Sequence, residues 1–160
     1  MKIQRAESWQ LPQILKIYEA ARTYMKEQGN PEQWKDGYPE ESLIALDIER
    51  KNLYLCCENG EILGVFYYAE EDDPTYRYIE GNWLNADPYG VVHRIAVAVH
   101  KKGVASFCFA YAFSKCHNLK IDTHRDNLPM QHALKKNGFL PCGTIYLENG
   151  EARMAFQKAE

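Results

Sequence analysis

The nine residues Val91–Val99, VVHRIAVAV, are apolar at every position except His93 and Arg94. A strand that is apolar on both faces lies inside a sheet whose two faces are covered. A basic, glycine-containing turn, HKKG, follows at once, and an apolar stretch of helical length begins near Val104. A buried strand that leads directly into an apolar helix predicts a mixed α/β sheet with this strand at its centre.

Hydrophobic periodicity divides the rest of the chain into helices and strands around this central strand. Ser8 is expected to cap a first helix, and the Asn59-Gly60 pair is typical of a hairpin turn. The order strand, helix, strand, helix, strand in the second half predicts parallel strands joined by crossovers. Strands are predicted at 3–5, 53–57, 62–68, 76–83, 91–99, 119–123, 139–147 and 153–157, and helices at 8–28, 42–51, 104–116 and 128–137.

The length of 160 residues suits a single domain spanning residues 1–160. A net charge of −3 offers no basic footprint for nucleic acid, and no apolar run is long enough to cross a membrane. The N-terminal segment lacks the pattern of a signal peptide, so a cytoplasmic location is expected. The five cysteines are not spaced as metal ligands, and they are predicted to be reduced thiols with no metal site.

The turn between the central strand and the apolar helix is a candidate anion site. The first backbone N–H groups of a helix lack partners inside the helix, and the helix dipole is positive at that end. Gly103 and the small Ala105 would let a phosphate approach the backbone, while Lys101 and Lys102 add positive charge. The alternative is an ordinary strand-to-helix turn with solvated lysines. The glycine patterns of a Walker A loop and of a Rossmann fingerprint are both missing.

The residues around this turn resemble the GNAT (GCN5-related N-acetyltransferase) family. His100, Gly103 and Ala105 match the spacing of that family's turn, although His100 stands where the family has Gln or Arg. The segments RIAV (94–97), LKIDTHRDN (119–127) and ALKKNGF (133–139) are similar to the family's central strand, the next strand with its loop, and a helix end. The resemblance covers nearly the whole chain in the family's order.

The resemblance implies the GNAT fold, with a central mixed sheet of six to seven strands, about four flanking helices, and a splay between the two central parallel strands. It implies that acetyl-CoA is the acyl donor and favours a homodimer. Asn127 would contact this cofactor or cap the following helix. The implied cofactor-binding residues are Ile95, Ala96, Val97, His100, Lys101, Lys102, Gly103, Val104, Ala105, Ser106 and Asn127.

Acetyl transfer to an amine needs a base, because a lysine-like amine is protonated at neutral pH. His93 is the candidate base, and strand alternation places it on the same face as Ile95. The family's acid, a tyrosine, is replaced by Leu134, so Tyr146 and His124 are the candidate proton donors. All three candidates also have structural alternatives.

The acceptor amine is expected to meet aromatic residues in the loops, which could equally anchor those loops to the core. The candidate substrate-binding residues are Trp34, Tyr38 and Trp83. The sequence therefore favours an N-acetyltransferase that works by direct attack of the amine in a ternary complex. A non-catalytic acyl-CoA-binding module is the alternative, and a domain that keeps only the fold is the third possibility.

Overall fold

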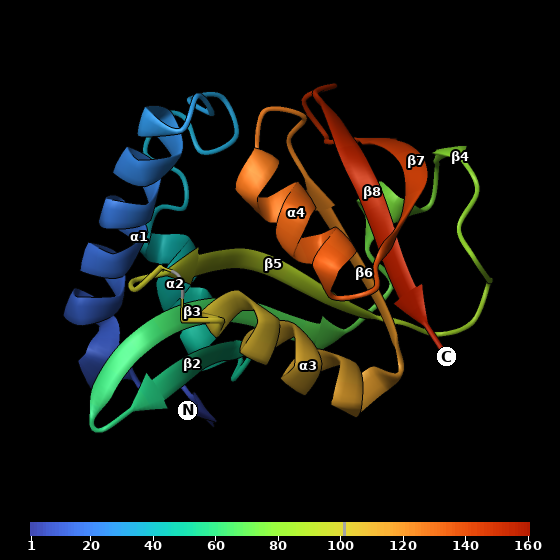
Figure 1. Ribbon diagram of the computed structural model, residues 1–160. Coiled ribbons are helices and arrows are strands. Elements are labelled where there is room, and N and C mark those ends of the chain that lie inside the picture. The colour runs from blue at the N-terminus through green and yellow to red at the C-terminus, as the bar shows by residue number, and fades with distance from the viewer. Residues whose placement is uncertain (101) are drawn as a thin grey trace.

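The computed structural model describes residues 1–100 and 102–160, and eight strands of these residues form one sheet (Figure 1). The strand order across the sheet is β1-β2-β3-β5-β6-β8-β7-β4. The strands are β1 (Lys2–Arg5), β2 (Leu53–Glu58), β3 (Glu61–Glu70), β4 (Glu80–Gly81), β5 (Gly90–Val97), β6 (Asn118–Thr123), β7 (Leu140–Tyr146) and β8 (Ala152–Ala159). The count exceeds the expected six to seven because the two-residue β4 adds a short edge strand beside β7.

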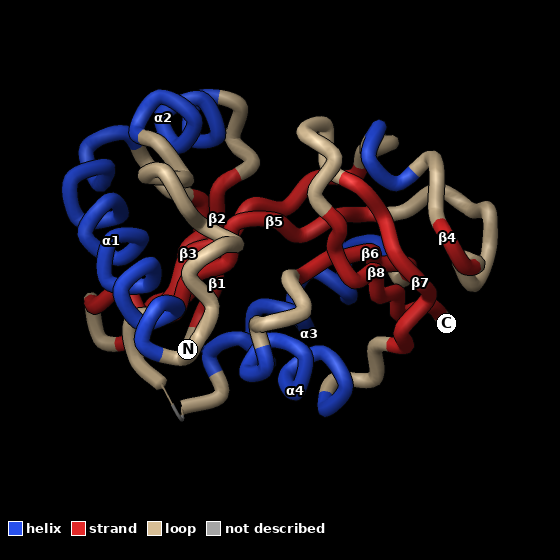
Figure 2. Tube along the Cα trace, turned by 90° about the horizontal axis from the view of Figure 1, so that it is seen from above, coloured by secondary structure: helices blue, strands red, loops and turns tan. Residues whose placement is uncertain are grey.

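Four α-helices cover the two faces of the sheet. They are α1 (Leu11–Glu27), α2 (Glu41–Glu49), α3 (Val104–Cys116) and α4 (Leu128–Lys136), with two short 3-10 turns, η1 (Ser8–Gln10) and η2 (Pro74–Tyr76). Seen from above, α1 and α2 lie on one side of the strands and α3 and α4 on the other (Figure 2). None of the helices in the described chain is long and apolar enough to cross a membrane.

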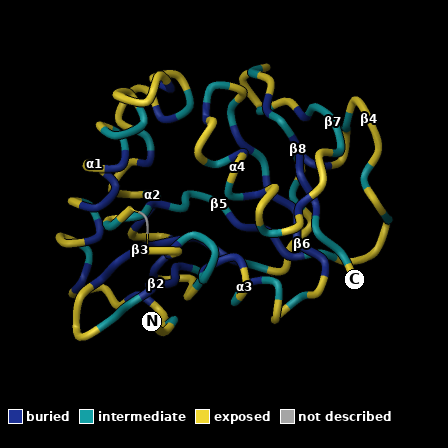
Figure 3. Tube along the Cα trace, in the orientation of Figure 1, coloured by how far each residue is buried: buried dark blue, intermediate teal, exposed yellow. Residues whose placement is uncertain are grey.

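Each face of the sheet has its own hydrophobic core. Ile14, Tyr18 and Ile44 belong to the core under α1 and α2, whereas Phe109 and Leu134 belong to the core under α3 and α4. Figure 3 shows the buried positions running along the central strands and the inner sides of the helices. Leu134, at the position of the family's tyrosine, is completely buried in this second core.

Strands β5 and β6 are parallel, but they pair only at their first residues. The pairs are Gly90 with Leu119 and Val91 with Lys120, and the two strands diverge beyond them. This arrangement confirms the predicted splay between two central parallel strands. The crossover through α4 is also present, although β8 inserts between β6 and β7.

A β-bulge interrupts β5 at Arg94. Tyr67 of β3 pairs with His93 and Val65 pairs with Ala96, so β5 has one residue more than β3 between the two pairs. Arg94 adopts a φ of 48°, and an extra residue of this kind reverses the alternation of faces beyond it. The ring of His93 stacks on Tyr67 of the α1/α2 core, whereas Ile95 packs on the α3/α4 core. The expectation that His93 and Ile95 share a face was therefore wrong.

Two other expectations from the sequence, a strand at 76–83 and a helix cap at Ser8, were wrong. The predicted strand at 76–83 is mostly irregular, because Asp73 Oδ1 accepts the backbone N–H of Thr75 at 2.9 Å and starts the turn η2. Ser8 does not cap α1. It begins the 3-10 turn η1, and Glu7 is the N-cap residue of that turn.

Candidate active site

A cleft of about 660 Å³ lies where β5 and β6 diverge. Its walls come from α1, the loop 32–38, β5, the starts of α3 and α4, the end of β6, and the β7–β8 loop. The predicted site residues that line it are Trp34, Tyr38, His93, Ile95, Ala96, Val97, His100, Gly103, Val104, Ala105, Ser106 and Asn127. Lys102, Trp83, His124 and Tyr146 do not line it, and Lys101 lies outside the described residues.

One end of the cleft, here called the cofactor end, is formed by the first turn of α3. Gly103 precedes this turn with a φ of 72°, a left-handed conformation that favours glycine. A Cβ atom added to Gly103 would meet nothing within 4 Å, so the space beside the turn is open. The first amides of α3 have no partners within the helix and can bind an anion. The Tyr24 ring stacks on His100 at a centroid distance of 4.0 Å and supports the turn from α1.

The opposite wall of the cofactor end is held by the two asparagines that flank α4. Asn127 Oδ1 accepts the backbone N–H of Met130 at 3.1 Å, so Asn127 is the N-cap residue of α4. Its Nδ2 donates to Gln33 Oε1 at 2.9 Å and ties α4 to the loop that follows α1. Asn137 Nδ2 donates to Ser106 Oγ at 3.0 Å and joins the end of α4 to the first turn of α3. The cleft walls are thus positioned by side chains from distant segments.

At the other end, here called the acceptor end, His93 is paired with Asp73. The distance from His93 Nε2 to Asp73 Oδ2 is 2.8 Å, and Asp73 also accepts the Thr75 hydroxyl at 2.8 Å. Burial raises the pKa of Asp73, but the bonds from His93 and Thr75 outweigh burial and lower it to about 2. The ionised carboxylate favours a proton on Nε2, which leaves Nδ1 as the proton acceptor of a neutral ring. Within residues 1–100 and 102–160, Nδ1 makes no hydrogen bond.

Arg94 anchors the bulge beside His93. Its Nε and Nη2 donate to the two carboxylate oxygens of Asp47 on α2 at 2.9 and 3.0 Å. Its Nη1 donates to the hydroxyl of Tyr38 at 3.3 Å, and its backbone oxygen accepts the Tyr18 hydroxyl at 2.7 Å. Burial alone would lower the pKa of Arg94, but Tyr38 and Asp47 raise it, so the guanidinium stays charged. The guanidinium also lies 4.6 Å from the centre of the Tyr67 ring.

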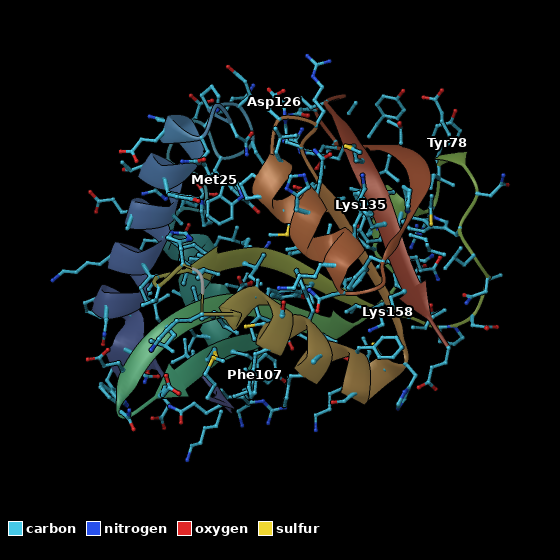
Figure 4. The ribbon with its side chains drawn as sticks, in the orientation of Figure 1. Met25, Tyr78, Phe107, Asp126, Lys135 and Lys158 are labelled. Atoms are coloured by element: carbon cyan, nitrogen blue, oxygen red, sulfur yellow. The ribbon has the colours of Figure 1, made fainter. Side chains whose placement is uncertain are left out.

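The structure does not bring the two proposed proton donors of the sequence analysis to the cleft. The Tyr146 hydroxyl donates to Glu80 of β4, and its ring stacks on Tyr78 at the far edge of the sheet. Figure 4 shows Tyr78 beside β4, away from Met25, which points from α1 into the cleft. His124 Nδ1 accepts the backbone N–H of Asp126 at 3.0 Å, and burial lowers the pKa of His124.

Trp83, predicted to contact the acceptor, instead anchors a loop. Its Nε1 donates to the backbone oxygen of Tyr76 at 2.9 Å, and the two rings pack with centroids 5.3 Å apart. The Lys120 ammonium lies 4.2 Å from the centre of the indole ring. Trp34 and Tyr38, by contrast, line the cleft at its acceptor end.

Asp73, Asp47 and Gln33 were not predicted from the sequence as site residues, and no role was predicted for Arg94. The one available signal was the charge of Arg94 inside an apolar strand, which needs a buried partner. Asp73 lies in the acidic run EEDD and looks like a solvated turn residue until its contact with His93 is known. Among the described residues, no cluster of three or more His, Cys, Asp or Glu could hold a metal ion, and the five cysteines are free.

Comparison with known proteins relates this architecture to acetyltransferases. Neither a family model nor a curated protein matches the sequence. A GNAT family acetyltransferase from Streptococcus agalactiae superposes with a TM-score of 0.88 at 28% identity, covering 99% of this chain and 95% of that one. A putative acetyltransferase from Staphylococcus aureus has a TM-score of 0.72 at 24% identity, with 99% of each chain covered.

A third solved structure in the comparison was determined with acetyl-CoA. It is a putative acetyltransferase from Salmonella typhimurium, with a TM-score of 0.67 at 14% identity, covering 99% of this chain and 92% of that one. At that identity the likeness concerns the fold alone.

Proposed function

The chain has the fold of the GNAT family of acetyltransferases over nearly its whole length, and on that premise we propose that it is an N-acetyltransferase. It would transfer an acetyl group from acetyl-CoA to a primary amine by direct attack in a ternary complex. The observation that carries the proposal is the single cleft with an open helix N-terminus at one end and the His93–Asp73 pair at the other. The proposal also includes a homodimer, on the basis of the sequence resemblance, and a cytoplasmic location, on the basis of the N-terminal sequence pattern.

The residues at the cofactor end suit an acyl-CoA. Gly103 leaves open space at the first turn of α3, where free amides would bind the pyrophosphate. Lys102 Nζ lies 3.4 Å from Glu58 Oε2 on the exposed surface, so it would add charge only from outside the cleft. The edge of β5 that faces β6 has no strand partner beyond Val91, because β6 diverges there. On this edge, the backbone of Ile95–Val97 could pair with the pantetheine amides. Acetyl-CoA, when bound, supplies the acetyl group as a reactive thioester.

His93 would prepare the acceptor amine. Deprotonating a lysine-like amine at neutral pH costs about 4–5 kcal/mol, and a base next to the amine offsets this cost. Nδ1 of His93 is free to take that proton, while Asp73 holds the opposite nitrogen and would stabilise the resulting imidazolium. The pair resembles other sites in which a buried carboxylate orients a catalytic histidine.

Two measurements test the proposal in order. Acetyl-CoA at millimolar concentration should raise the melting temperature, because a ligand that binds only the folded state stabilises it. Release of free thiol in the presence of a panel of primary amines should then reveal turnover, with the His93→Gln variant as the control. Absence of any thermal shift would exclude every function based on CoA.

The alternative is a non-catalytic acyl-CoA-binding module. It is favoured by Leu134, whose completely buried apolar side chain has no proton to give where the family has its tyrosine. In that case acetyl-CoA would stabilise the protein, but no amine of the panel would release thiol. The two functions therefore differ in the second measurement alone.

A further inference from the structure

Breaking the thioester leaves an electron pair on sulfur, and no residue proposed so far supplies the proton that sulfur needs. Leu134 has no acidic proton, and neither Tyr146 nor His124 lines the cleft. An alkyl thiolate takes up a proton near pH 8.5, so an acid close to the sulfur would speed its departure. The inference that follows rests on the proposed function and asks which residue is that acid.

The hydroxyl groups beside His93 at the acceptor end differ in whether their protons are already used. The Thr75 hydroxyl donates to Asp73 at 2.8 Å. Tyr38 differs because its oxygen is an acceptor, bound by Arg94 Nη1 at 3.3 Å. Among the described residues at this end, Tyr38 thus has the hydroxyl whose proton is not already committed.

The contacts of Arg94 determine where the Tyr38 proton can point. A guanidinium has five N–H donors and no acceptor, so Tyr38 cannot give its proton to Arg94. Two further donors of Arg94 are held by Asp47, and its side chain is 12% exposed, so the guanidinium has a fixed position. In the part of the chain that the structure describes, the Tyr38 hydroxyl donates no hydrogen bond. This proton is available to a ligand in the cleft.

Three further contacts hold the tyrosine in place. Its backbone N–H donates to the Lys35 oxygen at 3.1 Å, and its own backbone oxygen accepts Arg22 Nη1 at 3.3 Å. Its ring meets the ring of the buried Trp34 edge-on at 6.4 Å. A proton donor with a fixed position loses little entropy when it reaches the transition state.

The bulge at Arg94 brings this donor and the base to one place. In a regular strand, His93 and Arg94 would point to opposite faces of the sheet. Because of the extra residue, His93 stacks on Tyr67 and the Arg94 guanidinium lies 4.6 Å from the centre of the same ring. His93 and the Tyr38–Arg94 pair therefore reach the cleft from the same side of β5.

We propose that Tyr38 is the general acid for the leaving sulfur and that Arg94 is the residue that positions it. Tyr38 gives its hydroxyl proton to the sulfur, which receives the electron pair of the breaking carbon–sulfur bond. His93 passes the ammonium proton that it took from the acceptor to water, and the neutral amine nitrogen then bonds to the acetyl carbon. Nδ1 of His93, again unprotonated, takes the second proton from that nitrogen. Arg94 pairs with the phenolate until Tyr38 regains a proton from water or from His93, so the products are an amide and a free thiol.

The test compares the wild type with Tyr38→Phe, and with Tyr78→Phe as the matched control. Phe keeps the ring against Trp34 and removes only the hydroxyl, while Tyr78 is 65% exposed and lies outside the cleft. Tyr38→Phe should lower kcat about 100-fold, at the low end of the range for general acids because a thiolate is a good leaving group. Acetyl-CoA affinity by calorimetry should change by less than about twofold, about 0.4 kcal/mol.

A second readout needs only CoA and no acceptor. The carbon next to the CoA sulfur can be followed by carbon NMR in the bound state across a pH titration, since its shift reports the thiolate. A hydroxyl that donates to the sulfur stabilises the thiolate, so the wild type should hold more thiolate than Tyr38→Phe at the same pH. Tyr78→Phe should match the wild type.

The outcomes separate this inference from the proposed function. If CoA does not bind the wild type, both are overturned. If CoA binds but Tyr38→Phe has the same thiolate titration as the wild type, Tyr38 does not contact the sulfur and the inference fails, whether or not an acceptor is known. If turnover is found and Tyr38→Phe keeps its kcat, the acid role fails while acetyl transfer stands.

Discussion

The two ends of the cleft are built in different ways. The anion site of the cofactor end depends on one short stretch of sequence, in which β5 leads through the turn at Gly103 into the first turn of α3. The acceptor end depends on the loop after α1, on α2, on the turn after β3 and on β5, with Arg94 bonded to Asp47 and Tyr38, 47 and 56 residues away in the sequence. An anion site can thus be encoded locally, whereas an acid–base site here requires the folded chain.

The largest expected effect is loss of the base at the acceptor end. His93→Gln keeps a donor toward Asp73 but removes the titratable ring, so kcat should fall by about 100- to 10,000-fold. Acetyl-CoA affinity should stay within about twofold, because the cofactor end is untouched. Thiol-release kinetics and calorimetry give the two values. An unchanged kcat would show that the amine is deprotonated without His93.

Asp47→Ala should cause the largest loss of stability. It leaves the guanidinium of Arg94 buried without its carboxylate, which typically costs about 3–5 kcal/mol of unfolding free energy. Denaturant titration measures this loss. Glu49→Ala, an exposed position on the same helix, is the control and should change stability by less than about 0.5 kcal/mol. Similar stabilities for the two variants would mean that Arg94 finds water or another partner.

Asp73 should make the acceptor end sensitive to acid. The pKa of Asp73 in the folded protein is about 2, below its ordinary value of 3.8, so its ionised form stabilises the fold. This stabilisation, about 2 kcal/mol, is present above pH 4 and is lost as the pH falls toward 2. Asp73→Asn lacks it at every pH. The stability difference between the two proteins should therefore shrink between pH 4 and 2, and a constant difference would contradict the ion pair.

The cofactor end should respond to Gly103→Val, which places a β-branched side chain beside the first turn of α3. Affinity for CoA should fall at least tenfold, about 1.4 kcal/mol, because the side chain fills the space next to the free amides. Gly29→Val is a matched control, since Gly29 also has a positive φ and open space around it but lies outside the cleft. Equal CoA affinity in the two variants would mean that the phosphates do not bind at the first turn of α3.

The smallest effect is expected from Tyr146→Phe. The hydroxyl of Tyr146 is bonded to Glu80 at the β4–β7 edge, away from both ends of the cleft. Turnover and CoA affinity should stay within about twofold of the wild type. A large fall in kcat would mean that Tyr146 on β7 contributes to the acceptor end of the cleft.

The elements whose signals are local were predicted well. The helix Val104–Cys116 begins and ends as the apolar run predicts, and the Asn59-Gly60 hairpin joins β2 to β3 as expected. Periodicity and turn chemistry depend on neighbouring residues, so a single sequence reveals them. The strand predicted at 76–83 was wrong because its apolar residues have a non-local role. Tyr76 is buried in the α1/α2 core, and Ile79 and Trp83 pack against that core from a loop.

The site residues also differ in whether a local sequence signal predicts them. The cofactor-end residues predicted from His100 to Ser106 line the cleft where the structure describes them, except Lys102, which turns toward Glu58. The proton donors could not be predicted, because being near the substrate depends on packing between distant strands. Tyr146 is on β7. In the sheet, β6 and β8 lie between β7 and β5, so Tyr146 is far from the edge of β5 that borders the cleft.

The order of most elements, the buried central strand and the glycine turn that starts α3 can be predicted from local sequence patterns. Which residues meet at the acceptor end depends on how distant segments pack. The bulge at Arg94, where β5 has one residue more than its partner β3, is the clearest case. Strand alternation alone places His93 and Arg94 on opposite faces, and no local pattern marks the extra residue. The pairing with β3 reverses that placement and brings His93, Arg94 and Tyr38 to one cleft.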